Sequence, residues 1–248
     1  MLARDRGMRG IVLKNHYTST AGMAYLVRRQ VPGIEVFGGL ALNLTIGGIN
    51  PAAVEHMTRV SGGWGRIVWM PTFDAEHQVR FSQEDRPFVS VARDGVLLPE
   101  VQAVIALIAQ HGLVLATGHS SPEEALLLLR EARRQGVAQM VVTHAVFQPV
   151  LMDVAGMQEA ARLGAFLEFA GGTLLGAGAE DRVRSFATAI RAVGPEAVIL
   201  SSDLGQEGNP LPPDGYSALL DLLRGQGFGD QELDLMSKQN PARLLGLP

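Results

Sequence analysis

The sequence predicts an α/β protein with the architecture of a (β/α)8 TIM-like barrel that lacks its first βα unit. Apolar segments rich in β-branched residues recur along the chain, mostly 20 to 32 residues apart, and a helix-like segment usually follows each one. The 248 residues are 47% hydrophobic and show no break in composition, which favours a single domain spanning residues 1–248. A doubly wound open sheet is the alternative. Its common nucleotide-binding forms lose support, because the sequence has neither a GxGxxG motif after the first strand nor a Walker A motif.

The elements are predicted in order along the chain. Residues 1–9 are interpreted as the last turns of a helix, with Gly7 as its stop. Seven strands follow, at residues 10–16, 34–42, 66–72, from Gly112 onward, 138–144, 165–170 and 197–202. Helices are expected at about 20–30, 51–60, 99–110, 122–135, up to about 163, 180–193, 214–225 and 230–238.

The loop after the third strand is long and carries Asp74 and His77. Within it, VSVARDGVLL contains two short alternating runs around Arg-Asp-Gly, which predicts a β-hairpin near residues 86–99 that extends over the mouth of the barrel.

Three predicted strands end in residues of types that can bind a metal. GLVLATGHSS places His119 after one strand, MVVTHAV places His144 after the next, and AVILSSDLG places Asp203 after the last. The carboxyl ends of parallel strands meet at one edge, where ligands and chemistry collect. Imidazole and carboxylate suit Zn²⁺, Mn²⁺ or Fe²⁺, and a site with an open position would activate water. The alternative is that each residue only caps the helix that follows.

Lys14 and His16 form a second group, at the end of the first predicted strand. Three roles are open for Lys14: it could bind metal in carbamylated form, form a Schiff base, or pair with Glu168 or Asp203. Glu168 lies in an apolar strand and needs a partner, so it is either structural or part of the site.

Composition narrows the partners. The formal net charge is −4, and no basic run points to nucleic acid. No segment approaches the roughly 20 apolar residues of a membrane span, and the first ten residues are too polar for a signal peptide, so a cytoplasmic location is the expectation. With no cysteine, any metal must be held by histidine, carboxylate or a modified lysine.

These motifs resemble the amidohydrolase-type metal-dependent hydrolases. The segments TGHSSPEEA, VVTHA and ILSSD occupy the places where that superfamily carries a His, a His and an Asp on strands five, six and eight of its barrel. GIVLKNHYTSTAGMA, VFGGLALN and VWMPT are similar to an uncharacterised subfamily of this group. The resemblance covers essentially the whole chain.

The sequence departs from the superfamily pattern at two places. It has no His-x-His, which the superfamily carries on its first strand, and VWMPT ends in Thr72 where many members have a metal-bridging lysine. We therefore expect that the first βα unit is absent and that a gap separates strands 10–16 and 197–202. The unpaired edges of such a gap would favour a homo-oligomer.

The resemblance implies a metal-dependent hydrolase of an amide, ester or phosphoester bond in a small-molecule substrate. Its cofactor is a divalent metal, with zinc as the first choice. The predicted metal ligands are His119, His144, Asp203 and His16, and the predicted catalytic residues are Asp203 and Lys14. Asn15, Tyr17, Asn43 and Thr72 are predicted to bind substrate. The alternatives are a Schiff-base lyase or aldolase that uses Lys14, and a barrel without catalytic activity.

Overall fold

Seven parallel strands form one curved sheet, and they follow one another in the sheet as they do in the sequence. The computed structural model describes residues 1–174, 176 and 178–247. The strands are β1 (Gly10–Val12), β2 (Glu35–Ala41), β3 (Gly65–Trp69), β6 (Val114–Ala116), β7 (Gln139–Val142), β8 (Phe166–Ala170) and β9 (Val198–Ser201). All seven predicted strands are confirmed, and the parallel order is that of a TIM-like barrel.

Side chains alternate between the two faces of this sheet and build two cores. Leu40, Val68 and Leu115 are neighbours across β2, β3 and β6 and belong to the large core under the helices. Trp69 and Ala116 lie one residue further along and belong to the inner core on the concave side. Both faces are covered, which explains why the strands are almost continuously apolar in sequence.

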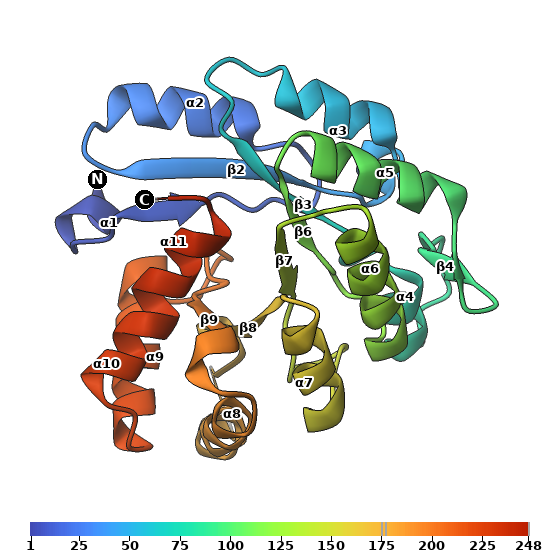
Figure 1. The fold of residues 1–248 in the computed structure, drawn as a ribbon. Helices are drawn as coiled ribbons and strands as arrows, with labels where there is room; N and C mark the ends of the chain where they lie inside the picture. Colours follow the sequence, from blue (N-terminus) through green and yellow to red (C-terminus); the bar gives the residue numbers. More distant parts are fainter. Residues whose placement is uncertain (175, 177, 248) are drawn as a thin grey trace.

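Helices surround the outer face of the sheet (Figure 1). The α-helices in the described ranges are α1 (Leu2–Asp5), α2 (Ala21–Gln30), α3 (Pro51–Thr58), α4 (Glu76–Phe81), α5 (Pro99–Gln110), α6 (Pro122–Arg134), α7 (Val154–Arg162), α8 (Ala179–Val193), α9 (Pro212–Gly225), α10 (Asp230–Asp234) and α11 (Asn240–Leu244). The expected helices are present, but the sequence did not predict α4 or α11. A π-helical turn at Leu235–Gln239 divides the predicted last helix.

The first strand is shorter than predicted. It ends at Val12, and residues 14–16 lie in a loop. The side-chain oxygen of Asn15 accepts the backbone N–H groups of Tyr17 and Thr18, at 2.8 and 3.0 Å. This local turn competes with the strand ladder for the backbone. Lys14 and His16 therefore project from a turn at the end of β1.

The sheet does not close on itself among the described residues. β1 lies at one edge and pairs with β2, while β9 lies at the other edge and pairs with β8. Leu244 and Leu245, at the end of α11, join the inner core with Phe37 of β2 and Ile199 of β9. The predicted gap between the edge strands is thus lined by α11, which lies beside β1 in Figure 1.

The hairpin predicted near residues 86–99 is present as β4 (Ala92–Arg93) and β5 (Val96–Leu97). Asp94 and Gly95 between them have φ angles of 50° and 76°, as a two-residue type I′ turn requires. None of the helices in the described ranges combines the length and the hydropathy that crossing a bilayer demands.

Candidate active site

A tight turn after β6 places His119. Gly118 has φ 64°, and a Cβ atom there would lie 2.3 Å from the carbonyl oxygens of Met70 and Pro71, so only glycine fits. This close approach lets the backbone N–H of His119 donate to the carbonyl of Pro71 at 2.9 Å. The side chain of His119 is 5% exposed. The turn therefore fixes the imidazole at the carboxyl end of the sheet, as the sequence predicted.

The other two strand-end residues have strained backbones. His144 has φ 49° and Asp203 has φ 46°, a region that residues other than glycine seldom adopt. Such strain is typical of functional sites, because the surrounding structure must hold it in place. His144 Nε2 lies 3.5 Å from Asp203 Oδ2, and the rings of His119 and His144 are 5.4 Å apart between centroids. The structure thus brings the three predicted residues together.

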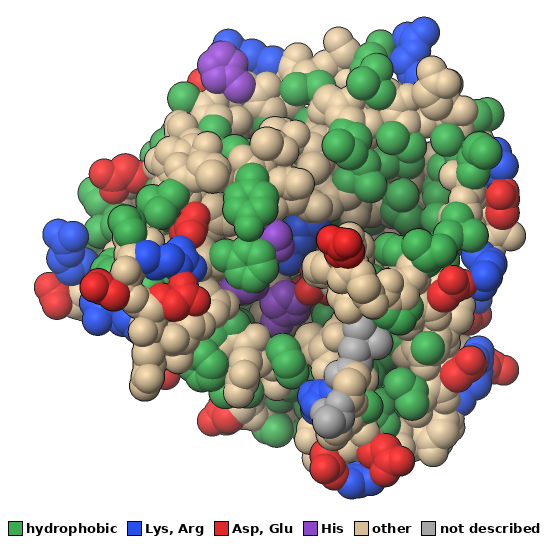
Figure 2. Space-filling view, turned by 180° about the vertical axis from the view of Figure 1, so that it is seen from behind, with side chains coloured by type: hydrophobic (Ala, Val, Ile, Leu, Met, Phe, Trp, Pro, Cys, Tyr) green, Lys and Arg blue, Asp and Glu red, His purple; other side chains and the backbone are tan. Residues whose placement is uncertain are grey.

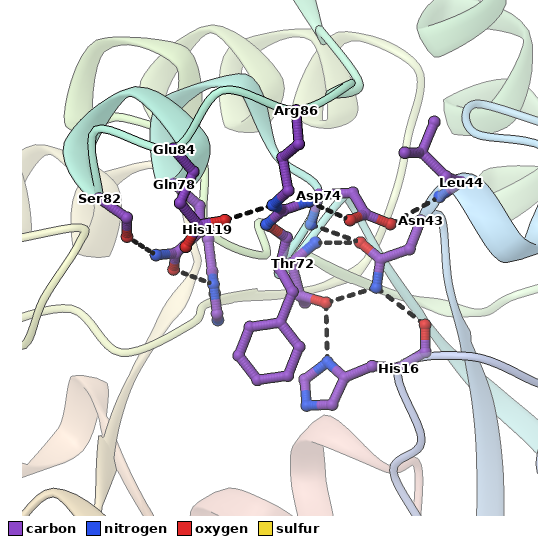
Figure 3. Close-up of polar contacts among 11 residues, drawn as sticks. His16, Asn43, Leu44, Thr72, Asp74, Gln78, Ser82, Glu84, Arg86 and His119 are labelled. Atoms are coloured by element: carbon purple, nitrogen blue, oxygen red, sulfur yellow. Dashed lines mark hydrogen bonds and ion pairs between the residues drawn. The ribbon is translucent and has the colours of Figure 1, made fainter.

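His16 lies against the end of β3 (Figure 3). Its Nδ1 atom is 2.8 Å from the Thr72 hydroxyl, and the side-chain amide of Asn43 donates to that same hydroxyl at 2.7 Å and to the His16 carbonyl at 2.9 Å. The Asn43 side-chain oxygen accepts the backbone N–H of Thr72 at 2.8 Å. Asn43 and Thr72 are 1% and 0% exposed. This buried network ties the loops after β1, β2 and β3 together and holds the His16 ring.

Asp74 is joined to the same network, because its backbone N–H donates to the side-chain oxygen of Asn43 at 3.3 Å (Figure 3). One carboxylate oxygen accepts the backbone N–H of Leu44 at 2.9 Å, and the other accepts from the Arg86 guanidinium at 2.6 Å. Arg86 also donates to the carbonyl of Phe73 at 2.5 Å. The segment between β3 and β4 is therefore clamped to the loop after β2.

Lys14 Nζ lies 3.5 Å from Asp203 Oδ1, on the opposite carboxylate oxygen from His144. Of the three roles considered for Lys14, the structure thus shows the ion pair with Asp203. Glu168 instead accepts the backbone N–H of His144 at 3.4 Å. A carboxylate in this apolar strand therefore supports the strained turn that carries His144.

Burial keeps the histidines of this cluster neutral. It is the largest cause that lowers the pKa of His119 well below its usual value, with His144 and Lys14 adding to the effect. Burial likewise lowers the pKa of His144 and, together with Lys14, lowers that of His16 to about 4. For Asp203, burial acts to raise the pKa, but Lys14 and His144 outweigh it and lower the pKa. The site therefore combines neutral imidazoles with an ionised carboxylate.

These protonation states are the ones that a divalent cation needs from its ligands. Two donors on a tetrahedral metal lie about 3.3–3.6 Å apart, given bonds of about 2.0–2.2 Å. The 3.5 Å between His144 Nε2 and Asp203 Oδ2 falls in this range. His119 Nε2 is buried and has no hydrogen-bond partner among the residues that the structure describes, and Gln78 engages the other ring nitrogen. As the side chains stand, no group of three or more His, Asp or Glu in the described ranges is placed to hold a metal. The fit therefore rests on the chemistry of the donors and on the one spacing between His144 and Asp203.

Two further predicted residues, Tyr17 and Asn15, lie around the cluster together with Phe73, which was not predicted. Tyr17 is 58% exposed, and Asn15 also lies exposed in the turn after β1. Phe73 is 44% exposed, and its ring centroid lies 4.1 Å from that of His16 and 5.8 Å from that of His119. Figure 2 shows histidine side chains recessed beside hydrophobic side chains on this face.

Sequence reasoning missed Gln78, Phe73 and Arg86. All three lie in the segment between β3 and β4, where α4 was not predicted. His77, predicted to lie in a loop, lies in α4 and bonds the carbonyl of Pro149 through Nε2 at 2.8 Å. The one sequence signal in this segment was its length, since long loops in compact domains are usually functional.

The fold is that of the amidohydrolases. The structure resembles a zinc-bound amidohydrolase from Burkholderia multivorans, with a TM-score of 0.67 and 15% identity over 100% of this chain and 86% of that chain. For an amidohydrolase from Pseudomonas aeruginosa the TM-score is 0.63 and the identity 13%, over 98% and 80% of the two chains. A triple mutant of the organophosphorus hydrolase from Deinococcus radiodurans gives 0.64 and 17%, over 99% and 81%. The predicted resemblance is confirmed at the level of the fold.

The family itself follows from the sequence. Residues 1–168 match the model of a family described as a family of unknown function (DUF6282), and the chain belongs to that family. No curated protein matches the chain.

Proposed function

We propose that this protein is a metal-dependent hydrolase that cleaves an amide, ester or phosphoester bond in a small-molecule substrate. The observation that carries the proposal is the cluster of His119, His144 and Asp203, which combines neutral imidazoles with an ionised carboxylate at the carboxyl end of the sheet. The fold supports it, because similar structures include an organophosphorus hydrolase and a lactonase from Deinococcus radiodurans.

His119, His144 and Asp203 would hold the metal, and zinc is the proposed metal. His16 interacts electrostatically with Asp203 and His144 and would be the fourth ligand. When bound, such a metal supplies Lewis-acid chemistry, lowering the pKa of water to about 7 and polarising a carbonyl or phosphoryl oxygen.

Asp203 is proposed as the general base. Its carboxylate is ionised at neutral pH, because Lys14 foremost offsets its burial and lowers its pKa, so it can accept a proton from the attacking water. It can then return that proton to the leaving group. Lys14 keeps Asp203 ionised through their ion pair at 3.5 Å and places a positive charge beside the reacting atoms.

Of the residues around the cluster, some are placed to contact substrate and others position His16. Tyr17 is exposed beside His16, with the ring centroids 6.3 Å apart, so it is placed to contact substrate together with Asn15. The side-chain amide of Asn43 bonds within the protein through both its nitrogen and its oxygen. Asn43 and Thr72 therefore act through His16, whose ring they hold.

A Schiff-base reaction at Lys14 is the alternative from the sequence. The ion pair with Asp203 opposes it, because the Lys14 side chain is engaged with the carboxylate, whereas a Schiff base forms from a free neutral amine. Borohydride trapping with a panel of aldehydes and ketones would label Lys14 if this alternative held.

The proposal is tested by zinc titration and a hydrolysis screen on wild type, His144→Asn and Asp203→Asn. We expect zinc affinity and hydrolysis of an aryl ester, a lactone or a phosphotriester to fall together, by at least about 100-fold, in folded variants. His111→Asn removes a histidine outside the cluster and should leave both unchanged. A wild type that binds no zinc, or variants that keep full affinity, would contradict the proposal.

A further inference from the structure

The side chain of Gln78 reaches from α4 to the imidazole of His119 (Figure 3). Gln78 Oε1 lies 2.8 Å from His119 Nδ1, and Gln78 Nε2 donates to the Ser82 hydroxyl one turn further along the chain at 2.8 Å. The other nitrogen of His119 is buried and has no hydrogen-bond partner within the described ranges. Gln78 is thus the polar contact that orients this ring.

We propose that Gln78 is a positioning residue: it holds His119 in the tautomer with the proton on Nδ1, so that the lone pair of Nε2 is free to bind a ligand in the site. The Nδ1–H group donates to the amide oxygen of Gln78. In neutral imidazole the second nitrogen is then an acceptor. A buried His119 Nε2 in this state is ready for an electron-poor partner such as a metal cation.

The opposite arrangement is less favourable. If the amide of Gln78 were turned over, its NH₂ group would donate to Nδ1, and the Ser82 hydroxyl could donate to the amide oxygen. The proton of His119 would then be on Nε2. That would bury an N–H donor with no acceptor, and unpaired buried N–H groups are rarer in proteins than unpaired acceptors.

The remaining contacts of the ring cannot set its tautomer. Phe73 meets His119 in an edge arrangement at 5.8 Å between centroids, and the ring of His144 lies 5.4 Å away. These contacts restrict where the ring lies but do not distinguish its two nitrogens. The amide of Gln78 does, because its oxygen requires a donor.

The clamp on this segment keeps Gln78 in place. Asp74 accepts hydrogen bonds from the backbone N–H of Leu44 and from the guanidinium of Arg86. Arg86 also donates a hydrogen bond to the carbonyl of Phe73. His77, directly before Gln78 in the chain, bonds the carbonyl of Pro149. These contacts fix α4 to the loops after β2 and β7. The backbone that carries Gln78 is therefore held in place relative to His119.

The tautomer is tested directly by long-range ¹H–¹⁵N correlation spectra of the histidine rings at neutral pH, with His119→Gln to assign the signal. We expect the Nδ1–H form in wild type. Gln78→Met has a similar length but no acceptor amide and should give a mixture of tautomers or the Nε2–H form. Gln78→Glu retains an acceptor and should restore Nδ1–H, while Gln158→Met, which removes a distant side-chain hydrogen bond, should change nothing.

An Nε2–H tautomer in wild type would overturn the proposal, as would an unaltered Nδ1–H form in Gln78→Met. The wild-type spectrum needs no variant, so the proposal stays testable if Gln78→Met fails to fold. Ser82→Ala then gives a milder perturbation and should raise the fraction of the minor tautomer.

The consequence for metal binding rests on the proposed function and has its own measurement. We expect Gln78→Met to weaken zinc binding about 10- to 100-fold and Gln78→Glu to stay close to wild type, as for other residues that orient metal ligands. Equal affinity in wild type and Gln78→Met would remove the role of Gln78 in metal binding. A wild type without zinc affinity would instead defeat the proposed function, while the spectra still decide the tautomer.

Discussion

At the scale of single residues, the candidate site depends on histidines that stay neutral. Burial lowers the pKa of His119 and His144, and burial with Lys14 lowers that of His16 to about 4. An exposed histidine in the unfolded chain has a pKa of about 6.5. The unfolded state therefore binds more protons than the folded state between about pH 6.5 and pH 4.

Protein stability should consequently fall as the pH is lowered through this window. The sign follows from the depressed pKa values: stability is complete above the unfolded pKa and is lost as protons favour the unfolded chain. Urea unfolding at pH 7 and pH 5 measures the effect. His144→Asn should show a smaller loss than wild type between these two pH values, and His111→Asn should match wild type. A stability that rises on acidification would contradict this account of the cluster.

The sequence predicted His119, His144 and Asp203 because each directly follows an apolar strand, and parallel strands end at one edge. It could not predict the contact between Gln78 and His119. These residues are 41 positions apart, and their contact depends on the rotation of a six-residue helix. It also could not predict that Asn43 would be buried, because its bonds to Thr72 form only once the strands pair.

At the scale of elements, the segment from β3 to β4 is the least regular part of the site. The sequence predicted α6 closely, since Ser121 and Glu124 form a capping box and Pro122 occupies the first turn. α4 has no comparable signal: Ala75 precedes it without a side-chain cap, and it spans only 6 residues. Its position is set by tertiary contacts instead.

Arg86→Ala should therefore loosen this segment without unfolding the protein. The variant loses the bonds to Asp74 and to the Phe73 carbonyl, and hydrogen bonds to charged groups contribute about 1.5–3 kcal/mol each. Because the Arg86 side chain is 32% exposed, solvent reduces this value, and we expect amide exchange across residues 73–89 to accelerate about tenfold. Hydrogen-exchange mass spectrometry measures it. Arg184→Ala, which breaks an exposed ion pair on α8, is the control, and unchanged exchange in Arg86→Ala would show that the clamp does not hold α4.

At the scale of the whole molecule, an open sheet of seven strands has to protect its inner core. Leu244 and Leu245 contribute to that core, 4% and 9% exposed, with Phe37 of β2 and Ile199 of β9. Regular alternation of strands and helices was enough to predict the barrel class. The place of α11 could not be predicted, because nothing in the sequence of residues 240–247, NPARLLGL, specifies which face of the sheet this helix meets.

Leu244→Ala should destabilise the protein by about 2–4 kcal/mol, because it removes buried methyl groups and leaves a cavity beside the edge strands. Leu222→Ala, at a leucine that is 40% exposed on α9, should cost much less. Urea denaturation of both variants provides the comparison. Similar losses for the two would mean that α11 does not stabilise the inner core.

The central claim is that His119, His144 and Asp203 hold a divalent metal at the carboxyl end of the sheet. Anomalous scattering from a crystal grown with zinc, recorded on both sides of the zinc edge, tests it most directly. The account predicts one peak about 2.0–2.2 Å from His119 Nε2 and from donor atoms of His144 and Asp203. Crystals of wild type that contain zinc in the solution but show no peak within reach of these three side chains would contradict it.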